Sequence, residues 1–124
     1  MSALEVERPE AAVVLGKALA AAWEKLNVSQ AGVAKIIGLS EATVSRIANG
    51  TYILKPAKHE WAGAVAFIRI FRSLAGLLDG DEVLMREWLH SNNAEFRKAP
   101  IEVLMEGGGV YRIGGYLDSM RGRF

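Results

Sequence analysis

Cysteine is absent from the 124-residue chain, which excludes disulfides, thiolate metal sites and cysteine nucleophiles together. Histidine is almost absent too. The two histidines, His59 and His90, are far apart in the sequence and do not form a helical metal-binding pair. The apolar stretch AGAVAFIRIF is interrupted by Arg69 and is much shorter than the roughly 20 residues that span a bilayer. We therefore expect no metal, no cofactor and no membrane partner.

An excess of charge is also missing: 15 Lys and Arg stand against 14 Asp and Glu, which gives a formal net charge of +1. The N-terminus, MSALEVERPE, has three glutamates and no basic region before an apolar run, so it does not resemble a secretory signal. The cytoplasm is the expected location. With 51% apolar residues, the chain is rich enough to bury a core.

Apolar residues recur at helical spacing along nearly the whole chain, which predicts an all-α fold. The first helix is expected over residues 9–26, ending at Asn27. Ser29 and Ser40 are typical N-caps, and Gly38 can adopt the positive φ of a turn between two short helices. The second of these, residues 41–48, is expected to bury Val44, Ile47 and Ala48.

Further helices are expected in the second half of the chain. One at residues 82–90 should bury Leu84, Met85, Trp88 and Leu89, and another should begin at Pro100. The final segment has helical spacing at Val110, Ile113, Leu117 and Met120, although Gly114 and Gly115 disfavour a helix by about 2 kcal/mol relative to alanines. A strand is the other possibility; we favour the helix because no sheet is available to pair with it.

The helix expected between Pro56 and Leu78 is apolar over most of its circumference. Such a helix lies either in the centre of a core or against a second chain. Because the chain is small, we predict a dimer interface, with Phe67 as one of its positions.

Two short helices joined by a turn that contains glycine form the helix-turn-helix arrangement. Gln30, Ala34, Gly38, Ser40 and Val44 have the order and spacing of the Xre and phage-repressor helix-turn-helix family, which this part of the chain resembles. Ala34 lies where the two helices cross, so its small size permits their close approach. The outer face of residues 41–48 stays polar and small, as a helix that enters the DNA major groove requires.

The residues predicted to contact operator DNA are those on that face and at the two helix N-termini. Arg46 is the best candidate for a guanine edge or a phosphate, Glu41 could accept from a cytosine amino group, and Gln30 meets phosphate. The predicted set is Gln30, Ser40, Glu41, Ala42, Thr43, Ser45, Arg46 and Asn49. Residues 1–60 carry seven Lys and Arg against six Glu, so one head gains little from counterion release and a homodimer should bind better.

The last part of the chain, EWLHSNNAEFRKAPIEVLMEGGGVYRIGGYLDSMRG, resembles the toxin-binding domain of Xre/MbcA/ParS-type antitoxins. The similarity rests on the Trp88-Leu89 pair, the Asn-containing loop, the helix led by Pro100, the glycines that follow it, and Arg121-Gly122. It implies an antitoxin of a type II toxin–antitoxin system. The partner would be a RES-domain toxin that consumes NAD, blocked at its active site by the C-terminal region while the head represses the shared operon.

The resemblance and the chemistry of the tail give a set of predicted toxin-binding residues. The tail has arginines, a flexible glycine and an aromatic end, which suit a cleft built for an anionic dinucleotide. The set is Trp88, Asn93, Pro100, Tyr111, Tyr116, Arg121, Gly122, Arg123 and Phe124. We expect three parts: a helix-turn-helix head (1–55), a central dimerisation helix (56–80) and a toxin-binding domain (81–124).

Two other functions remain open from the sequence. One is a stand-alone repressor whose C-terminal half senses a small molecule. The other is an enzyme, which we disfavour because the chain has no cysteine, no clustered histidines and no glycine-rich phosphate loop after a strand.

Overall fold

The computed structural model describes residues 3–122 and, within α1, side chains from residue 10 onward. The described chain contains helices and a single isolated bridge between Asn93 and Lys98, so the all-α prediction is confirmed. The final segment is a helix, as favoured. The elements are α1 (Ala3–Lys25), α2 (Gln30–Ile37), α3 (Glu41–Ala48), α4 (His59–Leu77), α5 (Glu82–His90), α6 (Pro100–Leu104) and α7 (Gly109–Arg121).

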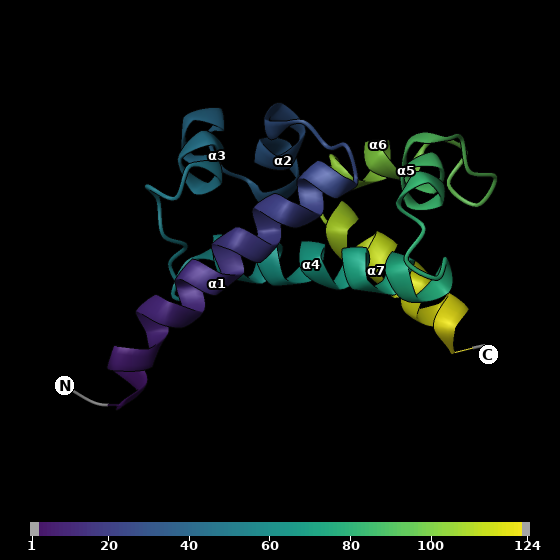
Figure 1. Cartoon of the computed structure of the whole chain (residues 1–124). Coiled ribbons are helices and arrows are strands. Elements are labelled where there is room, and N and C mark those ends of the chain that lie inside the picture. Colours follow the sequence, from purple (N-terminus) through teal and green to yellow (C-terminus); the bar gives the residue numbers. More distant parts are fainter. Residues whose placement is uncertain (1–2, 123–124) are drawn as a thin grey trace.

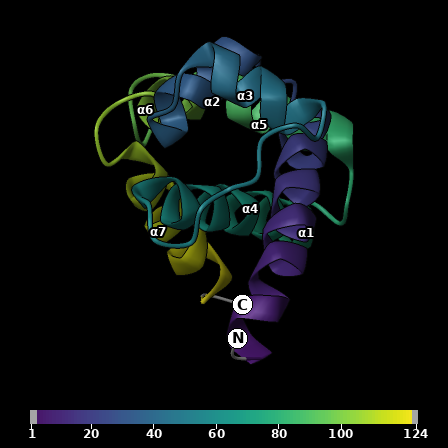
Figure 2. The ribbon, with the colours of Figure 1, turned by 90° about the vertical axis from the view of Figure 1, so that its left-hand side faces the viewer.

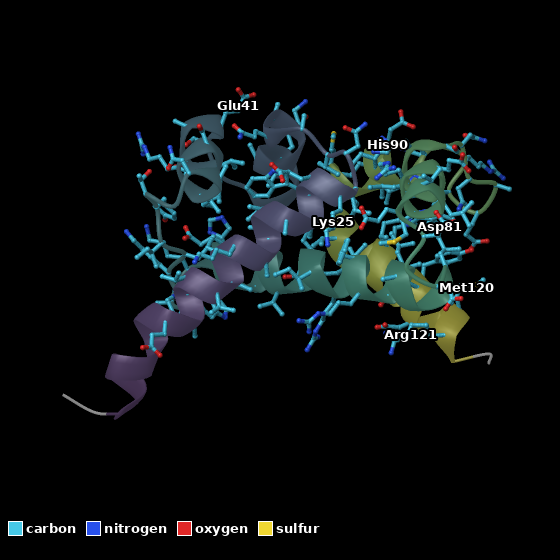
Figure 3. All side chains as sticks on the ribbon, viewed as in Figure 1. Lys25, Glu41, Asp81, His90, Met120 and Arg121 are labelled. Carbon is cyan, nitrogen blue, oxygen red and sulfur yellow. The ribbon has the colours of Figure 1, made fainter. Side chains whose placement is uncertain are left out.

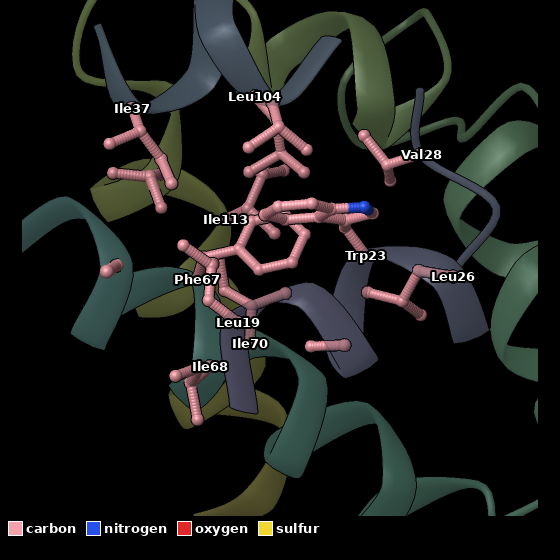
Figure 4. Packing of buried hydrophobic residues seen from close by; sticks show 14 of the residues in the cluster. Leu19, Trp23, Leu26, Val28, Ile37, Phe67, Ile68, Ile70, Leu104 and Ile113 are labelled. Carbon is pink, nitrogen blue, oxygen red and sulfur yellow. The ribbon is translucent and has the colours of Figure 1, made fainter. Parts of the chain in front are cut away.

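The helices form two layers. Figures 1 and 2 place α2, α3, α5 and α6 on one side, and α4 crossed by α7 on the other, with α1 running alongside. The central helix α4 packs on α1, α2, α5 and α7 of the same chain. One hydrophobic cluster extends from Leu19 to Leu117 and includes Trp23, Phe67 and Ile113, which lie close together in Figure 4.

Some local signals in the sequence were accurate. Ser29 Oγ accepts from the Gly32 N–H at 3.0 Å, and Ser40 Oγ accepts from the Thr43 N–H at 3.1 Å, so both predicted N-caps are confirmed. Gly38 has φ of +82°, and its N–H donates to the Ala34 carbonyl at 2.9 Å. The turn between α2 and α3 therefore uses the backbone conformation that glycine adopts most easily.

Other expectations were wrong. Pro56 does not start α4, which begins three residues later at His59. Ala48 and Leu84 are exposed rather than buried, so the sides of α3 and α5 that carry them face solvent. Phe67 is fully buried at the centre of the single chain, so it is not an interface position. The apolar breadth of α4 is explained largely by α1 and α7, which cover it from two sides.

Side-chain bonds hold the connecting segments. Glu60 is 2% exposed and accepts from the Tyr52 hydroxyl at 2.8 Å and from the Lys55 N–H at 3.0 Å, which fixes the chain between α3 and α4. Lys98, before α6, pairs with Glu106, after α6, and this hydrogen bond lowers the pKa of the Glu106 carboxyl. Buried polar side chains in the described part of the chain all have hydrogen-bond partners.

No single described helix has the length and apolarity of a membrane span. Only α4 and α5 taken together reach that length and apolarity, and a bend of 119° separates the two helices. Among the residues that the structure describes, no three His, Asp or Glu side chains gather as a metal site.

Candidate nucleic-acid and protein interfaces

The helix-turn-helix face is built on α2 and α3. Val33, Ala34, Val44 and Ile47 are buried and pack these helices onto the core. That packing leaves the opposite side of α3 in solvent. Glu41, Ala42, Ser45 and Arg46 are exposed there, and Figure 3 places Glu41 at the outer edge of the head.

Seven of the eight predicted DNA-contact residues are exposed, and Thr43 is the half-buried one. Gln30 begins α2, and Ser40 lies at the N-terminal end of α3, so both are near the positive ends of helix dipoles. Thr43 is half-buried, and its Oγ1 accepts from the Ser40 hydroxyl at 2.8 Å. The Thr43 hydroxyl is therefore engaged within the N-terminal turn of α3, where it stabilises the helix start.

Asn49 has a structural role as well. Its Oδ1 accepts from the Thr51 N–H at 3.1 Å and from the Thr51 hydroxyl at 2.5 Å, which fixes the exit from α3. The Arg46 side chain is exposed and makes no ion pair within the described residues. Arg46 is thus the cation on this face that is available to a ligand.

The predicted toxin-binding residues that the structure describes do not lie on one surface. Trp88, Tyr116 and Arg121 line one groove at the end of α4. Tyr111 lies elsewhere, 62% exposed, and lines a second groove between α4 and α7. Pro100 is buried at the start of α6, and Asn93 shapes its own loop by accepting from the Glu95 N–H. Gly122 ends α7, whereas Arg123 and Phe124 lie outside the described residues.

An aromatic cluster lies beside the first groove. The Trp88 and Tyr116 rings are stacked with centroids 6.3 Å apart, and Phe96 meets Tyr116 edge-on at 5.0 Å. Arg121 Nη1 donates to Ser73 Oγ at 3.0 Å and lies 3.7 Å from Asp118 Oδ1. These contacts hold the aromatic rings and the guanidinium in place before any partner binds, which lowers the entropy cost of binding.

Sequence reasoning missed the residues that join the two halves of the molecule. Arg86 Nη1 donates to the Lys25 carbonyl at 3.1 Å, and His90 Nε2 lies 2.9 Å from the Leu26 carbonyl oxygen. Both side chains come from α5 and satisfy carbonyls at the end of α1, where helices have no internal partners. A contact 61 or 64 residues apart in the chain leaves no periodic signal, so only the structure reveals it.

Two family models match the chain and together cover nearly all of it. The antitoxin Xre-like helix-turn-helix domain matches residues 5–69, which is more than half of the chain. The chain belongs to the Xre-like antitoxin family. The antitoxin Xre/MbcA/ParS C-terminal toxin-binding domain matches residues 73–123, so the partner of this Xre-like antitoxin is a toxin. No curated protein matches its sequence.

Proposed function

We propose that this Xre-like antitoxin neutralises an NAD-consuming RES-domain toxin in the cytoplasm and represses its own operon by binding operator DNA. The proposal makes it a non-enzymatic regulator. The observation that carries it is the toxin-binding domain match over residues 73–123, next to a helix-turn-helix head with an exposed reading face. The RES identity of the toxin comes from the family resemblance.

DNA binding would use the exposed face of α3. Residues 1–60 have nearly balanced charge, so a single head gains little electrostatic energy from phosphates. Two heads on one operator would add their contacts, since the second head binds intramolecularly once the first is bound. A homodimer is therefore part of the proposal.

The dimer contact would lie on the side of α4 that the chain leaves open. With Phe67 in the core, the remaining candidates line the groove between α4 and α7, of about 540 Å³, which includes Trp61, Ala62, Val65 and Tyr111. Ala62 is exposed, so Ala62→Glu should place a carboxylate on the contact without disturbing the core. Light scattering should change from a dimer to a monomer; a parent protein that is already monomeric at micromolar concentration would remove this part of the proposal.

Neutralisation is tested with the purified product of the neighbouring reading frame. That protein should consume NAD alone and stop when the antitoxin is added. A chain that ends at Gly122 removes Arg123 and Phe124 and keeps the Arg121 bond to Ser73. A longer deletion from Met120 would also remove groove contacts, so it would be harder to interpret.

The truncated antitoxin should fold and bind DNA as before, yet leave NAD consumption substantially active. If it inhibits the toxin completely, the last two residues do not block the active site. If the neighbouring product neither binds the antitoxin nor consumes NAD, the proposed function is wrong.

A further inference from the structure

We propose that the groove between the end of α4, α5 and α7 receives an apolar segment of the toxin, with Arg121 at its rim pairing with a carboxylate of that segment. This inference rests on the proposed function and deepens it, because it assigns a docking surface apart from the tail that would block the active site. The groove has a volume of about 480 Å³. It is lined by Leu74, Gly76, Leu77, Leu78, Trp88, Tyr116, Leu117, Met120 and Arg121.

The groove lies wholly inside the toxin-binding region. Its lining residues run from Leu74 to Arg121, and the family match runs from 73 to 123. The groove lined by Tyr111, in contrast, takes part of its wall from Trp61 to Arg69, inside the helix-turn-helix match. The two grooves have no lining residue in common. The toxin-binding domain match contains all of the lining of the groove at the end of α4, and it therefore favours that groove as the toxin surface.

The chemistry of the lining indicates the kind of segment that fits. Leu77, Leu78, Trp88 and Met120 are half-buried, so apolar surface remains in contact with water until a partner covers it. Trp88 and Tyr116 are already stacked on each other, and pre-ordered aromatic residues are typical centres of binding energy. An apolar side chain of the toxin would complete this cluster.

Arg121 determines which polar group the toxin segment should carry. It is the charged residue in the groove lining, and its Nη1 is already bonded to Ser73 Oγ, which directs the guanidinium along the rim. A guanidinium has five N–H donors, so this bond leaves others for a carboxylate. Asp118, at 3.7 Å, offers Arg121 an exposed contact that a partner's carboxylate can replace.

Two glycines provide a matched pair of variants. Gly76 lies in the wall of the proposed groove and Gly115 in the wall of the other groove, each in a helix. A Cβ added at either position meets nothing within 4 Å, so neither substitution should strain the fold. Gly76→Gln should fill the proposed groove, Gly76→Ala should add one methyl group, and Gly115→Gln should make the same change elsewhere.

The experiment measures binding of each variant to the NAD-consuming product of the neighbouring reading frame. Gly76→Gln should weaken binding by about tenfold or more, whereas Gly76→Ala and Gly115→Gln should stay within about threefold of the parent. Arg121→Gln should also weaken binding and make it less dependent on salt, because an ion pair would be lost. Melting temperature should stay close to that of the parent for both Gln variants at the glycines, and operator affinity should stay close for Gly76→Gln. Gly115→Gln changes the groove proposed for the dimer contact, so its operator affinity should fall while its toxin binding is kept.

Each other result has a defined meaning. Unchanged toxin binding by Gly76→Gln would overturn the groove as the docking surface while the proposed antitoxin function stood. Equal losses for Gly76→Gln and Gly115→Gln would overturn it as well. Loss of the dimer by Gly76→Gln with toxin binding intact would assign the groove to a second copy of this chain. A neighbouring product that does not bind the parent would remove both the groove and the proposed function.

Discussion

His90 lies with its Nε2 2.9 Å from the carbonyl oxygen of Leu26, which directly follows α1. A carbonyl oxygen accepts and does not donate, so Nε2 carries the proton of this bond. Arg86 donates in the same way to the Lys25 carbonyl, so two side chains of α5 provide hydrogen bonds to carbonyls at the end of α1. The helix-turn-helix region and the toxin-binding region are therefore joined by hydrogen bonds as well as by packing.

We predict that His90→Ala lowers the free energy of unfolding by about 1 kcal/mol, because the Leu26 carbonyl loses a partly buried donor. Urea denaturation monitored by circular dichroism would measure the change. Glu87→Ala, at an exposed position of the same helix, is the control and should alter stability much less. Equal midpoints for parent and His90→Ala would mean that water replaces the imidazole without cost.

Tyr52→Phe should destabilise the protein by about 1–3 kcal/mol, since the buried Glu60 carboxylate loses a hydroxyl donor. Burial, together with the bond to Glu60 and its negative charge, raises the pKa of Tyr52 above the ordinary value of 10.0. A raised pKa contributes stability that is present below pH 10 and lost as pH rises through the folded-state value. Denaturation between pH 8 and about 11 should show an alkaline loss in the parent that is absent from Tyr52→Phe. The same loss in both proteins would assign it to another group.

Gly109→Ala should destabilise the fold by about 1–3 kcal/mol or more. A Cβ at this position would lie 1.7 Å from the Val103 carbonyl oxygen, so the start of α7 must move away from α6. Gly107→Ala is the matched control, because a Cβ there meets nothing within 4 Å. Thermal unfolding of the two variants should differ clearly, and similar melting temperatures would indicate that the α6–α7 connection adjusts freely.

Arg46→Ala should weaken operator binding by about 1–3 kcal/mol, because Arg46 is the available cation on the exposed face of α3. Arg72→Ala removes the same charge from an exposed position on α4 and serves as the control. Gel-shift titration at constant salt compares them. Equal losses would attribute the effect to net charge, and no loss for Arg46→Ala would require a different contact face.

The sequence predicted well what depends on neighbouring residues. The caps at Ser29 and Ser40, the turn at Gly38 and the bounds of α3 follow from local backbone chemistry and were confirmed. Periodicity identified the apolar sides of α4 but could not determine what covers them. Phe67 was therefore assigned to a dimer contact, although α1 and α7 bury it within one chain.

The candidate sites divide in the same way. The residues of the DNA face are close in sequence, so their shared surface could be expected from helical spacing alone. The groove at the end of α4 is lined by residues of three helices, including Gly76, Trp88 and Met120. Gly76 has no side chain, so the sequence gives no sign that it lines a groove. Trp88, Tyr116 and Arg121 were expected at a toxin interface, but their proximity to one another depends on the packing of α7.

The shared core has a consequence for how such chains diversify. The boundary between the two family matches, at residues 69 and 73, falls inside α4, and Phe67 from one side packs near Ile113 from the other. A recombination event at that boundary would combine halves of two cores whose side chains had not adapted to each other. New toxin specificity should therefore arise more readily by point substitution around the groove at the end of α4 than by exchange of whole C-terminal regions.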